Sequence, residues 1–292
     1  MVRIPLARIE QLIAEDVPYV DLTTEVLGIG DCPGIMTYYT REDCVLAGTE
    51  VVMSMASDLG LSIGSYKPSG VCLAKDDDFF EVKGSAAQLH QLWKVGLNTF
   101  DHLSAVATKT RTMVDAVHAV NPHCEILTTR KSMPGAKDLL TLAVMAGGAY
   151  PHRLGLSETV LIFDNHLAFM GGIDGLIEKL PTIKSHCIEK KLFVETGVED
   201  ALRLAQFGAE NPHARLDGIQ FEKIPAEEMS GLVKKIRSID PLLTLIAAGG
   251  INPTNAASYA ATGIDGIATT APFTAKPIDM SVRPRDFPVG PR

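Results

Sequence analysis

The chain has 292 residues, of which 46% are hydrophobic and 21% charged, and its formal net charge at pH 7 is −8. This composition is typical of a soluble globular protein that is long enough to bury a sizeable core. The negative charge argues against a nucleic-acid or anionic-membrane surface, because those partners are themselves anionic. It leaves room for a small anionic substrate that is held by a few local cations.

The cysteines and the N-terminus indicate the compartment. The five cysteines are odd in number and include no CxxC pair, which predicts reduced, buried thiols and neither a disulfide frame nor a zinc site. Charged residues interrupt the N-terminal segment 1–17, so it does not resemble a signal peptide. No apolar stretch approaches the roughly 18 residues that a membrane span needs. We therefore expect a cytoplasmic protein.

The first third of the chain mixes short alternating runs with helical stretches. Residues 34–52 alternate like strand material and then turn at Gly48. Between about 85 and 120, leucine, valine and methionine recur at helical spacing, which predicts one or two long amphipathic helices. Asn121 and Pro122 end this helical pattern.

A regular alternation follows, in which short apolar runs are separated by helical patterns. The apolar runs cover residues 125–130, 159–164, 191–195, 217–222, 243–250 and 265–271. Alternation of this kind predicts parallel strands with helices outside them. Six units are two short of a complete eight-fold barrel. An α/β fold with an incomplete barrel is therefore the first expectation, and an open doubly wound sheet is the alternative.

Polar residues and glycines stand where each predicted strand ends. In chain order they are Arg130 with Lys131, Asp164, Glu195, Glu222, the Ala-Gly-Gly at 248–250 and Thr269-Thr270-Ala271. The carboxyl ends of parallel strands form one rim, and side chains on that rim converge on a ligand. A lone acid in such a place is more often a helix cap than a catalyst, but six such ends together indicate a site. We interpret the pair at 130–131 as an anion site.

Gly249 and Gly250 are candidates for binding phosphate. They precede a predicted helix whose start is marked by Pro253 and Thr254. Glycines let backbone amides approach a ligand closely, and a helix N-terminus favours an anion. Barrels usually bind phosphate at the loops after their last strands, which is where these glycines lie. The alternative is a tight turn without a ligand.

Two further pairs of polar residues belong to the same predicted rim. His152 and Arg153, between the first two predicted strands, add donors to the pair at 130–131 if they face the same opening. Glu195 and Glu222 end neighbouring predicted strands. Paired carboxylates hold Mg²⁺ or stabilise a cationic transition state. Cations on one side and carboxylates on the other suit a substrate with several phosphates together with a metal.

Two segments carry a family resemblance: "TRKSMPG" (129–135) and "AGGAYPHRLGLSETVLIFDNHL" (146–167). They resemble the core of type II phosphoribosyltransferases of the quinolinate phosphoribosyltransferase (nicotinate-nucleotide pyrophosphorylase) family. The resemblance extends from "EDVPYVDLTT" to "AAGGINPTNAASYAATGIDGI". It implies an N-terminal α/β sandwich domain with its linking helix at 1–112, a six-stranded incomplete α/β barrel that carries the site at 113–275, and a tail at 276–292 that packs back on the N-terminal domain.

The resemblance also implies a reaction and an assembly. A pyridine-type ring nitrogen attacks the anomeric carbon of phosphoribosyl pyrophosphate with the help of Mg²⁺, and pyrophosphate leaves. The implied assembly is a homodimer in which the N-terminal domain of one subunit covers the barrel mouth of the other.

Individual residues match the family's motifs. Arg130, His152 and Arg153 match the residues that grip the pyridine carboxylates, and Lys131 matches the lysine near the phosphoribosyl group. The acids that face the ribose and the metal correspond to Glu195, after a shift of one residue, and to Glu222, where the family has aspartate. The residues that match the 5′-phosphate cradle are Gly249, Gly250, Thr270 and Ala271.

Two positions depart from the pattern of the quinolinate enzymes. Phe163 stands where they have a lysine, which removes a charge-assisted contact worth roughly 1.5–3 kcal/mol. Lys94 replaces an arginine that reaches across the dimer, so the planar two-pronged grip is lost. Phe163 either stacks on a less charged ring or points into the core. These changes resemble the molybdenum-transport-associated ModD pyrophosphorylase subgroup and imply an acceptor less anionic than quinolinate.

Two other functions remain open from the sequence. A barrel lyase would use Lys131 as a Schiff-base nucleophile, activated by the neighbouring Arg130. A regulatory protein in molybdenum uptake would bind phosphoribosyl compounds or oxyanions without turnover. Trapping with borohydride distinguishes the lyase, and binding without release of pyrophosphate distinguishes the regulator.

Overall fold

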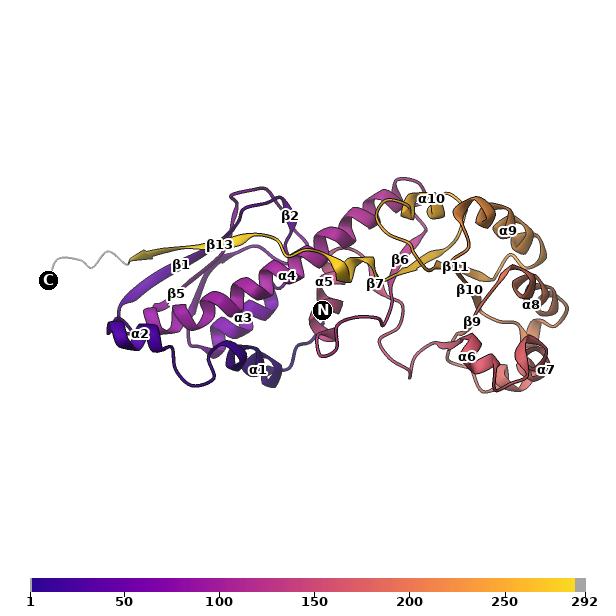
Figure 1. The fold of residues 1–292 in the computed structure, drawn as a ribbon, viewed down its shortest axis with the longest axis horizontal. Coiled ribbons are helices and arrows are strands. Elements are labelled where there is room, and N and C mark those ends of the chain that lie inside the picture. The colour runs from indigo at the N-terminus through magenta and orange to yellow at the C-terminus, as the bar shows by residue number, and fades with distance from the viewer. Residues whose placement is uncertain (1, 287–292) are drawn as a thin grey trace. The chain divides into compact units, whose positions relative to one another are not determined.

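The computed structural model describes residues 2–286 and divides into two compact units (Figure 1). The first unit comprises the chain up to residue 111, residues 132–148 and the chain from residue 272 onward. The barrel unit comprises residues 112–131 and 149–271. The contiguous domains expected from the sequence are a different partition of the chain and stay a prediction.

The first unit is built on a four-stranded antiparallel sheet with the order β13-β1-β5-β3. Its strands are β1 (Pro33–Thr40), β3 (Ser62–Tyr66), β5 (Asp78–Ser85) and β13 (Met280–Asp286). A two-stranded ribbon adds β2 (Cys44–Val45) and β4 (Cys72–Leu73). The helices are α1 (Leu6–Asp16), α2 (Leu22–Leu27), α3 (Thr49–Asp58), α5 (Lys137–Ala146) and the first part of α4 (Ala86–His118).

An aromatic cluster joins this sheet to α4. The rings of Tyr38, Phe79, Phe80 and Phe100 lie 4.9–6.4 Å apart, mostly in edge-on or tilted contacts. All four side chains are fully buried, and such pairs add packing energy beyond the apolar area they bury. The helical pattern at 85–120 is confirmed as one 33-residue helix, α4.

The C-terminal segment returns to the first unit. Strand β13 pairs with β1 along its length, from Thr40 opposite Met280 to Gly34 opposite Asp286. Residues 280–286 of the predicted tail therefore complete the sheet that β1 belongs to, while residues 287–292 lie outside the described part of the chain.

The barrel unit contains a curled, parallel seven-stranded sheet with the order β7-β6-β12-β11-β10-β9-β8. Six strands correspond to the six predicted runs: β6 (Glu125–Thr128), β8 (Val160–Ile162), β9 (Leu192–Thr196), β10 (Gly218–Glu222), β11 (Thr244–Ala248) and β12 (Gly266–Thr269). The seventh, β7 (Tyr150–Pro151), is a two-residue edge strand that no pattern predicted. The helices are α6 (Asp164–Leu167), α7 (Gly172–Ser185), α8 (Val198–Glu210), α9 (Ala226–Ile239) and α10 (Ala256–Ala260).

Two element boundaries differ from expectation. Strand β8 ends at Ile162, because the backbone turns at Phe163 and Asp164 opens the short helix α6. The last helix begins at Ala256 and not at 253–254, since Asn255 Oδ1 accepts a hydrogen bond from Asn252 N at 2.8 Å and holds a turn before the helix.

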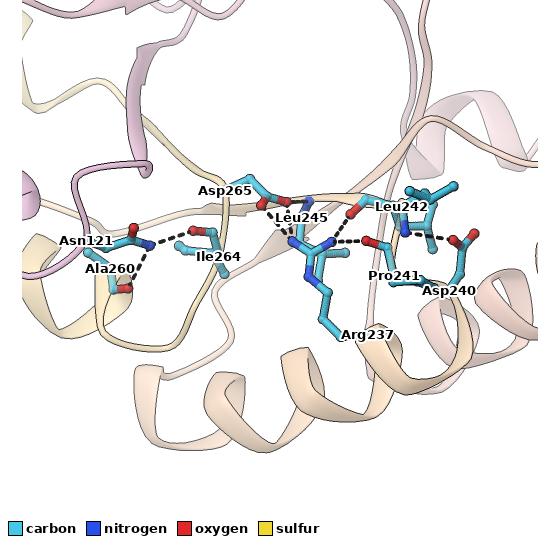
Figure 2. Close-up of polar contacts among 10 residues, drawn as sticks. Asn121, Arg237, Asp240, Pro241, Leu242, Leu245, Ala260, Ile264 and Asp265 are labelled. Atoms are coloured by element: carbon cyan, nitrogen blue, oxygen red, sulfur yellow. Dashed lines mark hydrogen bonds and ion pairs between the residues drawn. The ribbon is translucent and has the colours of Figure 1, made fainter.

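Side chains tie the amino ends of the barrel strands together (Figure 2). Arg237 on α9 donates to both oxygens of Asp265, at 2.7 and 2.6 Å, and Asp265 also accepts from Leu245 N at 2.7 Å. Asp217 has the same role one strand earlier, where it accepts from Leu192 N at 2.7 Å and pairs with Lys184. Each aspartate thus joins the start of one strand to its neighbour.

Two further observations concern the exposure of the cysteines and the character of the helices. All five cysteines are free thiols; Cys44, Cys124 and Cys187 are buried, while Cys32 and Cys72 are exposed and differ from the expectation of buried thiols. Among residues 2–286, no helix combines the length and the apolar character that crossing a membrane requires.

Candidate active site

The inner face of the barrel sheet has an apolar floor. Leu161, Phe193, Ile246, Ala248 and Ala268 form a buried cluster there, against which Leu127 and Phe163 also pack. Successive side chains of a strand point to opposite faces, so residues two positions beyond the floor face the same way at the carboxyl rim. The rim residues above this floor include Phe163, Glu195, Gly250 and Thr270.

Strand β10 contributes to the same face through a glycine. A Cβ on Gly218 would lie 2.1 Å from the ring of Phe193, so the absent side chain makes room for that ring. Gln220 and Glu222, two and four residues further along the strand, therefore also face the inside of the barrel. The structure brings Glu195 and Glu222 to one inner rim, as their positions at strand ends predicted.

Four side chains form a polar group above this floor. Gln220 Nε2 donates a hydrogen bond to Glu195 Oε2, and the charges of Glu222 and Lys131 act on the same carboxylate. Burial raises the pKa of Glu195, and the neighbouring Glu222 raises it further, whereas the Gln220 hydrogen bond and Lys131 oppose the rise. Two carboxylates that repel each other in this way attract a cation.

The end of strand β10 has an unusual backbone. Lys223 has a φ of 58°, in the left-handed region that side chains other than glycine rarely adopt. Its backbone N–H donates to Ala248 O at 2.8 Å, and its Nζ lies 3.1 Å from Glu222 Oε1. This turn ends β10 directly after Glu222 and thereby leaves the carboxylate on the rim.

A cationic group occupies another part of the rim. Burial lowers the pKa of Arg153 and the nearby Arg130 lowers it further, while the charge of Glu158 opposes the fall. Burial and Arg153 together lower the pKa of His152, so its imidazole is neutral at pH 7. His152 N donates to Thr128 O at 2.8 Å, which fixes the backbone beside the end of β6. Two adjacent guanidinium groups and a neutral imidazole are suited to bind an anion.

Phe163 joins this cationic group to the floor. Its ring packs against the buried inner cluster, while the guanidinium carbon of Arg153 lies 5.7 Å from the ring centre. Arg153 Nη1 also donates a hydrogen bond to Thr159 O at 3.3 Å. The imidazole of His166 stacks on the Phe163 ring, with 5.9 Å between the ring centres. The ring thus packs on the core and also contacts a rim cation, while its stacking on an acceptor ring stays a prediction.

The loop after β11 is open above Gly250, whereas Gly249 lies close against Lys223 and Glu222. Gly249 and Gly250 have φ values of 86° and 74°, and a Cβ on Gly250 would meet no atom within 4 Å. The side-chain amides of Asn252 and Asn255 donate to Gly250 O at 3.3 and 3.2 Å. The loop is thus held by its own side chains, and its backbone remains approachable.

The next loop is tied to this one. Thr269 Oγ1 donates to Ile251 O at 2.7 Å and accepts from Ala271 N at 3.0 Å. Thr270 follows the buried Thr269 at the end of β12, on the side of the floor residue Ala268. The four predicted cradle residues therefore lie on two loops that are connected by hydrogen bonds.

Comparison with known proteins identifies the family. The C-terminal domain of quinolinate phosphoribosyl transferase matches residues 106–283, and the N-terminal domain of the same family matches residues 21–104. The chain belongs to the quinolinate phosphoribosyl transferase family. It is accordingly a phosphoribosyltransferase, similar to enzymes named nicotinate-nucleotide pyrophosphorylase.

Relatives of two kinds cover nearly all of this family member. A protein of Rhodobacter capsulatus named "Putative pyrophosphorylase ModD" is 36% identical over 247 residues, covering 84% of this chain and 92% of that protein. The nicotinate-nucleotide pyrophosphorylase (carboxylating) of Mycobacterium leprae is 30% identical over 269 residues and 90% of each chain. The structure of the nicotinate-nucleotide pyrophosphorylase from Francisella tularensis superimposes with a TM-score of 0.84, at 25% identity over 97% of this chain and 98% of that one.

Lys94 belongs to a different unit from the other predicted residues of this phosphoribosyltransferase. It lies on the part of α4 in the first unit, where its Nζ is 4.8 Å from the centre of the Trp93 ring. Its predicted role toward the acceptor stays a prediction.

The oxygens of the polar group fit a hard divalent cation. Mg²⁺ is commonly bound through one or two carboxylates together with substrate phosphates, and Glu195 and Glu222 supply such a pair. Gln220 Oε1 is buried and has no hydrogen-bond partner among the described residues, so it adds a second kind of oxygen nearby. Within residues 2–286 no group of three or more His, Cys, Asp or Glu side chains forms a complete metal site, so water, and substrate phosphates when they are bound, would supply the remaining ligands.

Two residues of the site were not predicted from the sequence. Gln220 is a polar residue within the apolar run 217–222, and that contrast was the one signal that marked it. Lys223 gave no signal, because the left-handed backbone at the end of β10 is not apparent from its residue type.

Proposed function

We propose that this phosphoribosyltransferase transfers ribose 5-phosphate from phosphoribosyl pyrophosphate to a ring nitrogen of a small heteroaromatic acceptor that is less anionic than quinolinate. The observation that carries this proposal is the contact of the Arg153 guanidinium with the ring of Phe163. An aromatic ring in this place presents no positive charge to the acceptor. Arg130 and Arg153 are then the cations available on that part of the rim, and they suit one carboxylate better than two adjacent ones.

The arrangement of the cations supports an anionic group on the acceptor. The charge of Arg130 disfavours the charged form of Arg153, so the two guanidinium groups repel each other. A carboxylate between them removes this repulsion and accepts hydrogen bonds from both. The neutral imidazole of His152 offers one further donor without adding charge.

The opposite part of the rim supports transfer of the phosphoribosyl group. The transition state carries positive charge on the ribose ring, and in this proposal the carboxylates of Glu195 and Glu222 stabilise it. Lys131 and the loops with Gly249, Gly250, Thr270 and Ala271 bind the phosphates in this proposal. Glu195 and Glu222 would hold Mg²⁺, which when bound neutralises charge on the leaving pyrophosphate.

We further propose that the protein is a cytoplasmic homodimer. Support comes from large apolar side chains that the first unit exposes near its N-terminus; they are Tyr19, Val20, Leu22, Val26 and Leu27. A role in molybdenum uptake is also a proposal, and it is supported by the similarity to proteins named ModD.

Release of pyrophosphate tests the function. The protein is incubated with phosphoribosyl pyrophosphate and Mg²⁺, and quinolinate, nicotinate, nicotinamide and related pyridines are supplied in parallel. Release with a ring that carries one or no carboxylate, and not with quinolinate, is the expected result. Release with quinolinate accompanied by CO₂ would contradict the argument from Phe163.

Other outcomes of this experiment separate the alternatives. Binding of phosphoribosyl pyrophosphate without release, whichever ring is added, favours the regulatory protein. A covalent adduct at Lys131 after borohydride treatment with a carbonyl substrate favours the lyase.

A further inference from the structure

Gln220 is a polar side chain in an apolar layer. It lies on β10 between Glu195 of β9 and Ile246 of β11 in the strand register, and it is 5% exposed. The side chains that form the surrounding floor are apolar: Leu127, Leu161, Phe193, Ile246, Ala248 and Ala268. An amide in such a layer costs folding free energy unless its hydrogen bonds are made.

The amide makes its hydrogen bonds on one side. Nε2 donates to Glu195 Oε2, whereas Oε1 is buried and accepts from no described residue. Exchanging the two atoms would place Oε1 against the carboxylate oxygen, so the orientation of the amide is set by Glu195. The one hydrogen bond that Gln220 makes to another side chain in the described structure is thus directed at a carboxylate of the site.

Packing alone does not explain this residue. Methionine has nearly the same length and volume, and it would fill the layer without a buried oxygen that lacks a partner. The unpaired oxygen is therefore a cost to folding that methionine would avoid, and it is set against the hydrogen bond to Glu195. What the amide supplies in exchange is a fixed position for Glu195 beside Glu222.

We propose that Gln220 is a positioning residue that holds Glu195 in place, so that the carboxylates of Glu195 and Glu222 together bind a divalent cation. The inference rests on the proposed function, because that function is what requires the cation. Hydrogen-bond partners of metal ligands commonly change metal affinity by about 10–100-fold, and Gln220 stands in that relation to Glu195.

Binding of Mn²⁺ to the full-length protein tests the proposal without turnover. Free Mn²⁺ is measured by electron paramagnetic resonance, with no substrate present, for the natural protein, Gln220→Met and Gln206→Met. Gln206 is the matched control, because its exposed amide donates to Glu210 Oε1 at 2.6 Å on the outer helix α8. We expect Gln220→Met to weaken Mn²⁺ binding about tenfold or more and Gln206→Met to leave it unchanged.

Thermal unfolding supplies a second readout. Gln220→Met removes a buried oxygen without a partner but also the hydrogen bond to Glu195, so its Tm without metal should change by no more than about 2 °C. If the residue were merely structural, Tm would fall by more than this and Mn²⁺ binding would not change. Gln220→Leu is the second variant if Gln220→Met does not fold, and the same loss of Mn²⁺ affinity is expected.

The outcomes separate this proposal from the function on which it rests. Equal Mn²⁺ affinity in the natural protein and Gln220→Met overturns the proposal, and so does a natural protein that binds no Mn²⁺. If no acceptor supports pyrophosphate release while Gln220→Met still loses Mn²⁺ affinity, the proposed function fails and the positioning role stands.

Discussion

The two ends of the barrel strands carry charged side chains in opposite arrangements. At the amino end, Asp265 lies against Arg237 and Asp217 lies against Lys184, and each aspartate also accepts a backbone N–H. At the carboxyl end like charges are neighbours, since Arg130 acts on Arg153. Glu195 and Glu222 repeat this with negative charge, although Lys131 acts on Glu195 and Lys223 Nζ lies 3.1 Å from Glu222 Oε1.

The difference teaches which charges serve the fold and which serve a ligand. Pairs of opposite charge that also bond the backbone stabilise the native state. Like charges held together destabilise it until something of opposite sign arrives, which is the usual condition of a binding site. Arg130, Lys131 and Arg153 form no ion pair within residues 2–286, whereas the cations of the amino end do.

Lys131→Met gives the largest expected effect on activity. Lys131 contributes charge to the site and forms no ion pair within the described chain, so its loss should lower kcat/KM about 100-fold while unfolding changes by less than about 0.5 kcal/mol. The matched control is Lys184→Met at the amino end, which should lower Tm and leave kcat unchanged. Steady-state kinetics and thermal unfolding measure both; the reverse pattern would show that the two ends do not divide these roles.

Arg237→Met should give the largest loss of stability. The change leaves Asp265 without its cation and removes hydrogen bonds to the carbonyl oxygens of Pro241 and Leu243. Because both charged groups are only partly buried, we expect a loss of about 2 kcal/mol, measured by urea unfolding. Activity per folded molecule should stay within a factor of about two; a larger fall would mean that the amino end also acts on the site.

Phe163→Leu should change acceptor binding moderately. Leucine keeps an apolar contact with the floor but removes the ring beside the Arg153 guanidinium. A contact of this kind is worth about 0.5–2 kcal/mol, so KM for the acceptor should rise about twofold to thirtyfold while KM for phosphoribosyl pyrophosphate stays the same. A matched rise in both constants would contradict a role of Phe163 confined to the acceptor.

The sequence predicted much of the barrel because buried parallel strands appear as apolar runs. Each of the six runs became a strand, and the rule that carboxyl ends share a rim brought Glu195 and Glu222 to one face. The two-residue β7 was missed, since Tyr150 and Pro151 form no pattern, and its strand character comes from pairing with β6 alone.

The remaining features of the site depend on facts that a linear pattern does not contain. The register between β9 and β10 places Gln220 beside its hydrogen-bond partner Glu195. The left-handed backbone of Lys223 ends β10 directly after Glu222. Phe163 illustrates the same limit, because its type is compatible with a core position and with a rim position. The register and the end of β8 placed its ring in contact with both.

The smallest predicted effect concerns Asp101. It tests whether a buried carboxylate oxygen without a hydrogen-bond partner is by itself a sign of a functional residue. Asp101, on α4 in the first unit, has an Oδ1 that is buried and accepts from no described residue. Its pKa is raised to about 7, chiefly by burial and also by the charge of Asp279, while Met280 N–H and Lys94 oppose the rise. Unlike the rim charges, Asp101 is placed against the segment that leads into β13, where Ile278 N donates to Asp101 O at 3.1 Å. We therefore expect it to affect stability alone.

The pH dependence of unfolding follows from the sign of this shift. Between its ordinary pKa of 3.8 and about 7, the folded protein keeps a proton on Asp101 that the unfolded chain has released, so stability falls as pH rises through that window. Asp101→Asn cannot ionise, and it should be more stable than the natural protein by about 1 kcal/mol at pH 8, after allowance for solvent screening, with little difference at pH 4. Urea unfolding at the two pH values measures this, and a loss of activity at unchanged stability would instead place Asp101 with the charges that serve a ligand.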